Sequence, residues 1–170
     1  MIELYILRHA VAKSRDEWRG EDDSERPLTG KGEKEMWRVA KAMKKLGLSF
    51  DLILSSPFVR ARRTAEIVCD VFKAGQKLKL TPALGADASP ERFLKRIPKM
   101  VGSARKIVLV GHEPFLSELI ALLLVREARA LVKLSKGGLC KVTVESMRAP
   151  QPLLEWLLTR EQLVAMTTKR

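Results

Sequence analysis

Short apolar runs alternate with segments of helical periodicity along this chain, and that alternation limits what the chain can fold into. Each run is too short for a helix and is bounded by polar or turn-forming residues, which is typical of a buried strand. The runs cover residues 2–7, 50–54, 78–81 and 106–110. Repeated strand-to-helix alternation favours an α/β sheet with helices packed on both of its faces.

Capping residues predict where the intervening helices begin and end. Thr29 is a predicted N-cap and Gly47 a predicted C-cap of the first helix. Pro90 and Pro114 each open a later helix, because proline is favoured in the first helical turn. Pro98 is expected to end or kink the helix that Pro90 opens.

The last part of the chain follows a different pattern. After two glycines at 137 and 138, runs at 139–144 and 153–158 have little helix between them, which predicts antiparallel pairing at one edge of the sheet. The predicted fold is therefore a three-layer α/β/α sandwich with a mostly parallel central sheet and an antiparallel edge. A length of 170 residues fits one domain covering residues 1–170.

The charge balance of the chain is strongly basic. It has 32 Lys and Arg residues against 20 Asp and Glu, a formal net charge of +12, so its surface attracts phosphate groups, nucleic acid or acidic proteins. Cys69 and Cys140 are too isolated to indicate a disulfide framework or a zinc site. The first residues lack the features of a signal peptide, and the longest apolar run is far shorter than the roughly 20 residues that span a bilayer. We expect a cytoplasmic protein without a membrane partner.

The two histidines of the chain each follow a predicted strand directly. His9 comes after the first run, preceded by Arg8, and His112 comes after the fourth. The second run is followed by Ser-Ser-Pro at 55–57, with Arg60 one turn into the next predicted helix. The carboxyl ends of parallel strands meet at one edge of a sheet, so we expect these four side chains to converge there.

Two imidazoles beside two guanidiniums suit a phosphoryl group. The planar guanidinium matches phosphate oxygens with paired N–H groups and stays charged at any working pH. The same positive charges lower the pKa of a neighbouring imidazole, which leaves it neutral and able to attack phosphorus. The sequence holds no cluster of metal ligands, so we expect no metal or other cofactor and assign to the arginines the charge that magnesium carries elsewhere.

Several motifs in these positions resemble those of one family. Residues 7–10, Leu-Arg-His-Ala, resemble the Arg-His-Gly signature of the histidine phosphatase (phosphoglycerate mutase-like) superfamily. Residues 55–65 resemble its second arginine motif, residues 110–113 its second histidine motif, and residues 26–32 the segment that opens its first helix. The resemblance runs from residue 2 to about 125 with the motifs in order.

The chain further resembles the small, SixA-like phosphohistidine phosphatases, because about thirty residues separate the second predicted helix from the strand at 106 and leave little room for a cap domain. This resemblance implies that His9 is the nucleophile and becomes transiently phosphorylated. It implies that Arg8, Arg60 and His112 hold the phosphoryl oxygens. The implied substrate is phosphohistidine on a protein partner, such as a histidine phosphotransfer domain.

Three features of the expected site depart from the pattern or lie outside its motifs. Ala10 stands where glycine is commonest, and an alanine would be strained if that position needed a positive φ. Asp87 and Glu91 lie in the segment where larger relatives carry their proton donor, and are the candidates for that role. Arg26 is a further candidate for binding phosphate.

Other functions stay open at the level of the sequence. A small-molecule phosphomonoesterase acting on sugar or nucleotide phosphates would use the same four residues, and so would a binding protein that holds phosphate without hydrolysis. A mutase is less favoured, because it must protect its phosphorylated intermediate from water. The charge also suits a nucleic-acid-binding module, but the chain lacks a motif for one, and Trp18, Trp37 and Trp156 are scattered along it. A nucleic-acid partner is therefore disfavoured.

Overall fold

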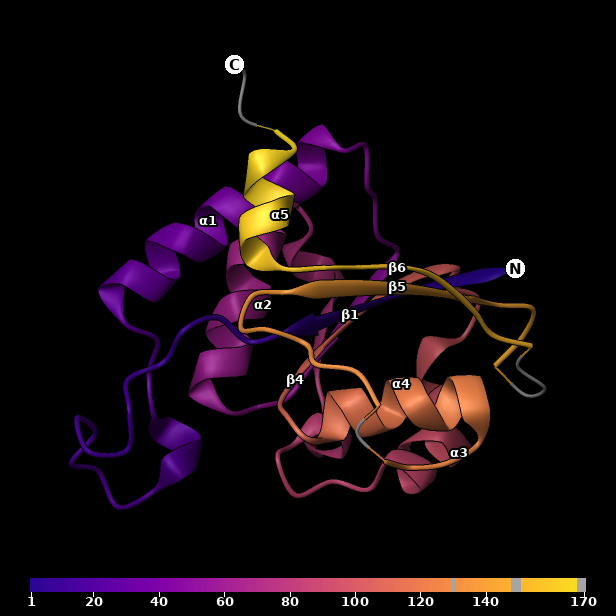
Figure 1. The fold of residues 1–170 in the computed structure, drawn as a ribbon, viewed down its shortest axis with the longest axis horizontal. Helices are drawn as coiled ribbons and strands as arrows, with labels where there is room; N and C mark the ends of the chain where they lie inside the picture. The colour runs from indigo at the N-terminus through magenta and orange to yellow at the C-terminus, as the bar shows by residue number, and fades with distance from the viewer. Residues whose placement is uncertain (130, 148–150, 168–170) are drawn as a thin grey trace.

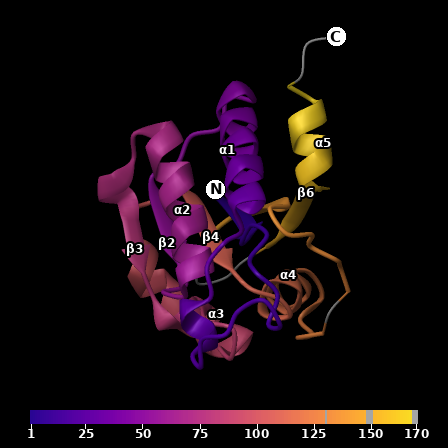
Figure 2. The ribbon, with the colours of Figure 1, turned by 90° about the vertical axis from the view of Figure 1, so that its left-hand side faces the viewer.

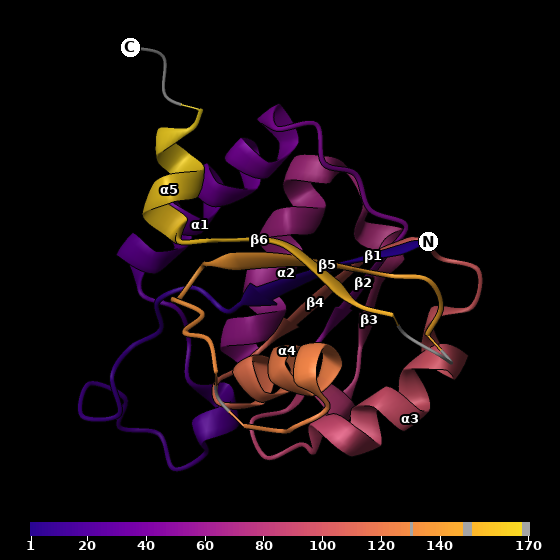
Figure 3. The same cartoon turned by 45° about the vertical axis from the view of Figure 1, so that its right-hand side comes forward.

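The computed structural model describes residues 1–129, 131–147 and 151–167. In this part of the chain one mixed sheet has the strand order β3-β2-β4-β1-β5-β6. Its strands are β1 (Ile2–Arg8), β2 (Leu52–Ser55), β3 (Leu78–Leu80), β4 (Lys106–Gly111), β5 (Leu139–Val144) and β6 (Leu153–Leu158). The first four strands pair in parallel, whereas β5 pairs antiparallel with both β1 and β6. The predicted parallel sheet with an antiparallel edge is confirmed, and β6 forms that edge (Figure 3).

Helices cover both faces of the sheet (Figure 1). One face packs against α1 (Gly30–Lys45), α2 (Val59–Phe72) and α5 (Arg160–Ala165). The other packs against α3 (Pro90–Val101) and α4 (Phe115–Val125), so that the three predicted layers are seen in Figure 2. Short 3₁₀ helices, η1 (Asp23–Glu25), η2 (Gly75–Lys77) and η3 (Pro82–Leu84), lie in the connections. None of the helices described is long and apolar enough to cross a membrane.

Strand β1 shows why the sheet needs continuous apolar runs. Leu4 and Ile6 pack into the core under α3 and α4, and Tyr5 and Leu7 pack into the core under α1 and α2. Successive side chains of a strand point to opposite faces, so a strand covered on both sides is apolar at nearly every position. The apolar run therefore places β1 in the middle of the molecule.

The predicted helix ends are confirmed for α1 and revised for α3. Thr29 Oγ1 accepts a hydrogen bond from Gly32 N at 2.9 Å, and Gly47 has a φ of +76° just after the helix. Pro98 was expected to end or kink its helix, and it does not end it, because α3 continues through Pro98 to Val101. Ile97 and Val101 are both buried in the core, and this packing holds the last turn despite the missing proline N–H.

Helix α5 was not expected from the sequence pattern. It begins with a capping box in which Thr159 accepts from Gln162 N and the Gln162 side chain accepts from Thr159 N. This Thr-x-x-Gln signal is visible in the sequence. The helix has only six residues, with Leu163 buried, so its periodicity is too short to stand out.

The register of the sheet brings three strand ends together. Strand β4 lies between β1 and β2, with Arg8 opposite Gly111 and Ser55 opposite Val110. The residue that follows each of these strands therefore lies at one common edge. Those residues are His9, His112 and Ser56.

Candidate active site

His9 is held rigidly just beyond β1. Its N–H donates to Gly111 O at 3.1 Å, which extends the β1–β4 pairing past the strand, and the side chain is only 7% exposed. Its Nδ1 lies 2.7 Å from Ala10 O. A carbonyl oxygen can only accept, so Nδ1 carries the proton and Nε2 keeps its lone pair.

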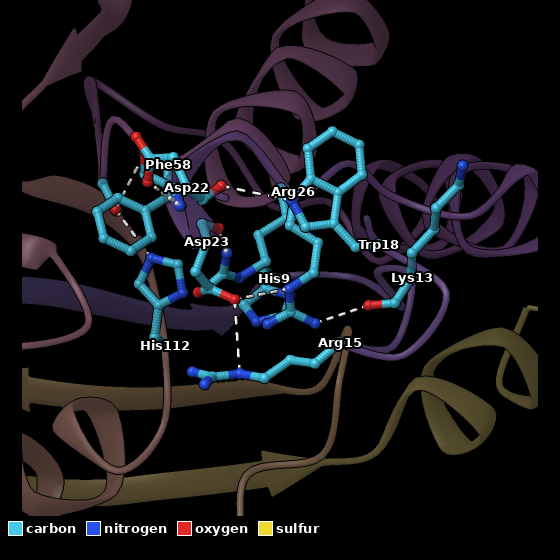
Figure 4. A network of polar contacts seen from close by, with 12 residues as sticks. His9, Lys13, Arg15, Trp18, Asp22, Asp23, Arg26, Phe58 and His112 are labelled. Carbon is cyan, nitrogen blue, oxygen red and sulfur yellow. Dashed lines mark hydrogen bonds and ion pairs between the residues drawn. The ribbon is translucent and has the colours of Figure 1, made fainter. Parts of the chain in front are cut away.

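His112 lies beside His9 at the end of β4. The two ring centroids are 5.1 Å apart (Figure 4), and the His112 side chain is fully enclosed. Its Nε2 lies 2.8 Å from Ser56 Oγ, at the end of β2. Its Nδ1 is buried and has no hydrogen-bond partner in the described part of the chain. The hydroxyl of Ser56 was not expected as a site group, although it follows its strand just as the histidines do.

Both imidazoles are neutral at pH 7. Burial, together with the neighbouring His112 ring and the charges of Arg60 and Arg8, lowers the pKa of His9 well below its ordinary value, although the hydrogen bond to Ala10 O opposes the shift. Burial and the charge of Arg60 lower the pKa of His112 to about 3. The environment therefore keeps the Nε2 lone pair of His9 free of a proton.

Arg60 is fixed in the first turn of α2, with its side chain only 4% exposed. Its Cζ lies 5.1 Å from the ring centroid of Phe58, whose ring also packs on His112. Thr64, one turn further along α2, donates to Arg60 O at 2.7 Å and accepts from Ala10 N at 3.0 Å. Thr64 thus ties α2 to the residues that follow His9. Ala10 does not have a positive φ, so its alanine is not strained.

Arg8 is the last residue of β1, and its side chain is bound to the segment before β5. Its Nη1 donates to Leu134 O at 2.9 Å, and Gly137 N donates to Arg8 O and to His9 O. The charge of Arg8 contributes to the lowered pKa of both histidines. Lys136 lies in the same segment, and burial and the charge of Arg8 lower its pKa. The structure thus adds a lysine that the motifs did not indicate.

Asp23 completes the cluster, and the sequence did not point to it. Its Oδ2 accepts from Arg60 Nη2 at 2.9 Å and its Oδ1 from Arg26 Nε at 2.9 Å, with Arg15 Nε at 3.7 Å (Figure 4). Arg26 also donates from Nη1 to Lys13 O at 2.6 Å. Arg26 therefore reaches the site through Asp23, and its role in phosphate binding stays a prediction.

The two predicted proton donors, Asp87 and Glu91, are both exposed, and their role stays a prediction. Asp87 is exposed and lines a surface hollow with Arg92 and Arg96. Glu91 is exposed in the first turn of α3, where the hydrogen bond from Ser89 Oγ lowers its pKa. A proton donor needs a raised pKa, so this environment opposes the role for Glu91.

A carboxyl group with the opposite shift follows His112 directly. Burial raises the pKa of Glu113, and its Oε1 is enclosed without a hydrogen-bond partner among the described residues. Ser117, in the first turn of α4, holds the carboxyl group through its side chain and N–H. The pKa direction of Glu113 is the one that a proton donor requires.

The cluster as a whole suits a tetrahedral oxyanion. It offers a neutral, oriented imidazole beside guanidiniums that supply fixed positive charge and N–H donors. No group of three His, Cys, Asp or Glu residues that could hold a metal ion occurs in the described ranges.

A family model for the histidine phosphatase superfamily (branch 1) matches residues 4–85 of the chain. The matched segment contains His9 and Arg60. The chain belongs to the histidine phosphatase superfamily. The resemblance predicted from the motifs is thus confirmed.

Two relatives show how far similarity within the superfamily extends. An uncharacterized protein of a Picosynechococcus species is 35% identical over 139 residues, covering 81% of this chain and 82% of that protein. A probable phosphoglycerate mutase of Escherichia coli, GpmB, is 40% identical over 76 residues, covering 42% of this chain. The match spans only 34% of GpmB, about a third of its length.

Solved structures confirm the phosphoglycerate mutase-like fold of this chain. The protein histidine phosphatase SixA, solved with tungstate, has a TM-score of 0.82 at 21% identity, covering 95% of this chain and 99% of SixA. The alpha-ribazole phosphatase of Shigella flexneri has a TM-score of 0.74 at 20% identity, covering 94% of this chain and 97% of that one. Proteins with different substrates thus share this fold.

Proposed function

We propose that this histidine phosphatase hydrolyses its substrate through a phosphohistidine intermediate on His9, and that the substrate is phosphohistidine on a protein. The observation that carries the proposal is the state of His9. Its Nδ1–H is committed to Ala10 O and its pKa is lowered, so Nε2 is an unprotonated nucleophile beside Arg60.

The proposed reaction has two steps at phosphorus. His9 Nε2 attacks, the bond from phosphorus to the leaving nitrogen or oxygen breaks, and the leaving group takes up a proton. Water then attacks the phosphohistidine, the P–N bond breaks, and inorganic phosphate leaves with His9 restored. The covalent intermediate divides hydrolysis into two steps, each with a lower barrier than direct attack by water.

The phosphoryl oxygens are held by charge and by N–H donors in this proposal. Arg60 presents its fork at the helix start, Arg8 adds a second guanidinium, and the unpartnered Nδ1 of His112 is available as an N–H donor. Preorganised donors of this kind are the main source of catalysis in phosphoryl transfer. The guanidiniums here carry the charge that a metal ion carries elsewhere.

Protein phosphohistidine is favoured by the lack of a cap domain between β3 and β4 and by charge. The segment from β3 to β4 contains only η3 and the twelve-residue α3, so it provides no cap domain. A net charge of +12 favours encounter with acidic protein partners. The similarity to SixA over nearly the whole chain points the same way.

A small phosphoester is the second candidate substrate. The similarity to the alpha-ribazole phosphatase covers almost as much of the chain as that to SixA. Both reactions use the same nucleophile, so the site chemistry does not separate them. A direct comparison of substrates does.

The deciding experiment is rapid-quench kinetics with a ³²P-labelled histidine phosphotransfer domain, alongside sugar phosphates, nucleotides and p-nitrophenyl phosphate. We expect acid-labile phosphate on the intact enzyme and none on His9→Ala, with kcat lowered by roughly 10⁴-fold or more, the scale seen when a nucleophile is removed. Full turnover by His9→Ala would contradict the mechanism. Faster turnover of a small phosphoester than of the phosphorylated domain would contradict the protein substrate alone.

A further inference from the structure

Residue 23 occupies the edge of Arg60 that a phosphoryl group would use. Asp23 Oδ2 accepts from Nη2 of Arg60 at 2.9 Å, and the main-chain oxygen of Asp23 accepts from Nη1 at 2.7 Å. Phosphate binds arginine through two such parallel N–H groups. The Nε of Arg60 is buried and has no partner in the described part of the chain, so the edge that includes it is closed to solvent.

Arg60 has little freedom to offer another edge. Its side chain is 4% exposed and its guanidinium lies over the ring of Phe58. Binding of a phosphoryl group at this arginine therefore requires Asp23 to withdraw. Because one of the two bonds comes from the main chain of Asp23, a change of its side-chain rotamer does not suffice, and the backbone must move too.

The charges around Asp23 favour its exchange for an anion of higher charge. Arg60 and Arg26 donate to its carboxylate, and the exposed Arg15 lies at 3.7 Å (Figure 4). Their positive charge, with the hydrogen bond from Arg26, holds the pKa of Asp23 below its ordinary value despite the opposing effect of burial. Asp23 therefore stays ionised as a single negative charge facing three guanidiniums. A dianion in its place would neutralise them more fully.

The segment that carries Asp23 is held by few buried contacts. The 3₁₀ helix η1 contains no buried residue. The polar segment 13–26 is joined to the rest of the protein by the bridge between Ala12 and Leu28 at its base and by the two polar bonds from Arg60 to Asp23. Little apolar surface is therefore lost when η1 moves. Segments with few buried apolar contacts are the ones that open at low cost in free energy.

We propose, on the basis of the function proposed above, that Asp23 is an internal ligand of the phosphate site, which substrate must displace by moving the segment 13–26. The closed form, with Asp23 on Arg60, binds no anion. The apparent Kd for any tetrahedral anion is then the intrinsic Kd divided by the fraction of open protein. Removing the carboxylate should tighten the binding of different anions by one common factor.

The test measures phosphate and tungstate binding by calorimetry in the intact protein, in Asp23→Asn and in Glu25→Gln. Glu25 is exposed in the same η1 and loses the same charge, so it controls for the overall electrostatic change. We expect Asp23→Asn to lower both Kd values about tenfold or more and by the same factor, and Glu25→Gln to change them less than about twofold. Asp23→Ala provides a second variant should Asp23→Asn fold poorly.

The direction of the change in anion affinity separates this proposal from a positioning role for Asp23, because the two predict opposite changes. If Asp23 merely held Arg60 in place, Asp23→Asn would weaken anion binding. Weaker or unchanged binding therefore overturns the proposal, as does an intact protein that binds neither anion.

Trp18 reports whether the segment itself moves. Its Nε1 donates to Asp22 O at 3.4 Å, one residue from Asp23. In a protein carrying Trp37→Phe and Trp156→Phe, saturating tungstate should change the emission of Trp18. Binding without any change in emission would overturn the displacement.

Failure of this inference is distinguishable from failure of the proposed function. Anion binding needs no turnover. Tighter anion binding by Asp23→Asn in a protein that never forms acid-labile phosphate would therefore support Asp23 as an internal ligand and contradict the proposed phosphatase function. An active enzyme whose Asp23→Asn variant binds phosphate more weakly would support the proposed function and contradict Asp23 as an internal ligand.

Discussion

The site has two walls that are built differently. The strand wall consists of His9, His112, Ser56 and Arg60, which follow strands or start a helix and are all buried. The loop wall consists of Arg15, Asp23 and Arg26, which lie on the polar segment 13–26. The groups that need a fixed geometry thus lie on the buried strand wall. Asp23, which substrate is proposed to displace, lies on the less buried loop wall.

After the loss of His9 itself, the largest effect on turnover is expected in the strand wall, at Arg60. Lysine cannot supply two parallel N–H groups, so Arg60→Lys should lower kcat/KM about 100-fold, the scale on which loss of one oxyanion donor slows other enzymes. The matched control is Arg62→Lys, on the same helix, whose side chain is 48% exposed and pairs with Glu66 at 3.4 Å. Arg62→Lys should stay within about twofold of the intact enzyme. Equal losses in the two variants would remove the distinction between Arg60 and an ordinary surface arginine.

The buried histidines should make the strand wall sensitive to acid. Their pKa values are lowered in the folded protein but ordinary, about 6.5, in the unfolded chain. Below pH 6.5 the unfolded chain therefore binds protons that the folded protein does not. Stability is fully present above that pH and falls as pH drops toward the folded value of about 3 for His112.

Urea unfolding at pH 7.5 and 5.5 measures this loss. It should reach up to about 1.4 kcal/mol for each histidine over this range, and His112→Gln should show about half the loss of the intact protein. Glu113 has a raised pKa and shifts stability in the opposite direction, but it is present in both proteins and cancels in the difference. An identical pH dependence in both proteins would contradict a buried, neutral His112.

An effect on stability alone is expected at the junction between the two walls. A Cβ on Gly32 would lie 2.1 Å from Val11 O, so α1 packs directly against the residues that follow His9. Gly32→Ala should lower the free energy of unfolding by about 1–3 kcal/mol, because the overlap is with backbone. Gly30→Ala is the matched control, since nothing lies within 4 Å of its Cβ, and it should change stability by less than about 1 kcal/mol. Similar urea midpoints for the two variants would show that this junction is not rigid.

The elements of the fold were predictable where the sequence carries a strong local signal. The apolar runs predicted the strands, and Thr29 and Gly47 predicted the ends of α1. Helix α5 was missed because six residues carry too little periodicity, although its capping box was present. The prediction from Pro98 that its helix ends there failed because Ile97 and Val101 are buried in the core and hold the last turn. The local sequence does not show this tertiary packing.

The sequence by itself determined which groups gather at the strand ends. Burial requires apolar strands, parallel strands end on one side, and so His9 and His112 had to meet once their strands were neighbours. Only the tertiary structure decided that Asp23 lies on Arg60 and that Ser56 meets His112. The path of a polar loop and the pairing of side chains depend on contacts between distant segments, and no local periodicity encodes them.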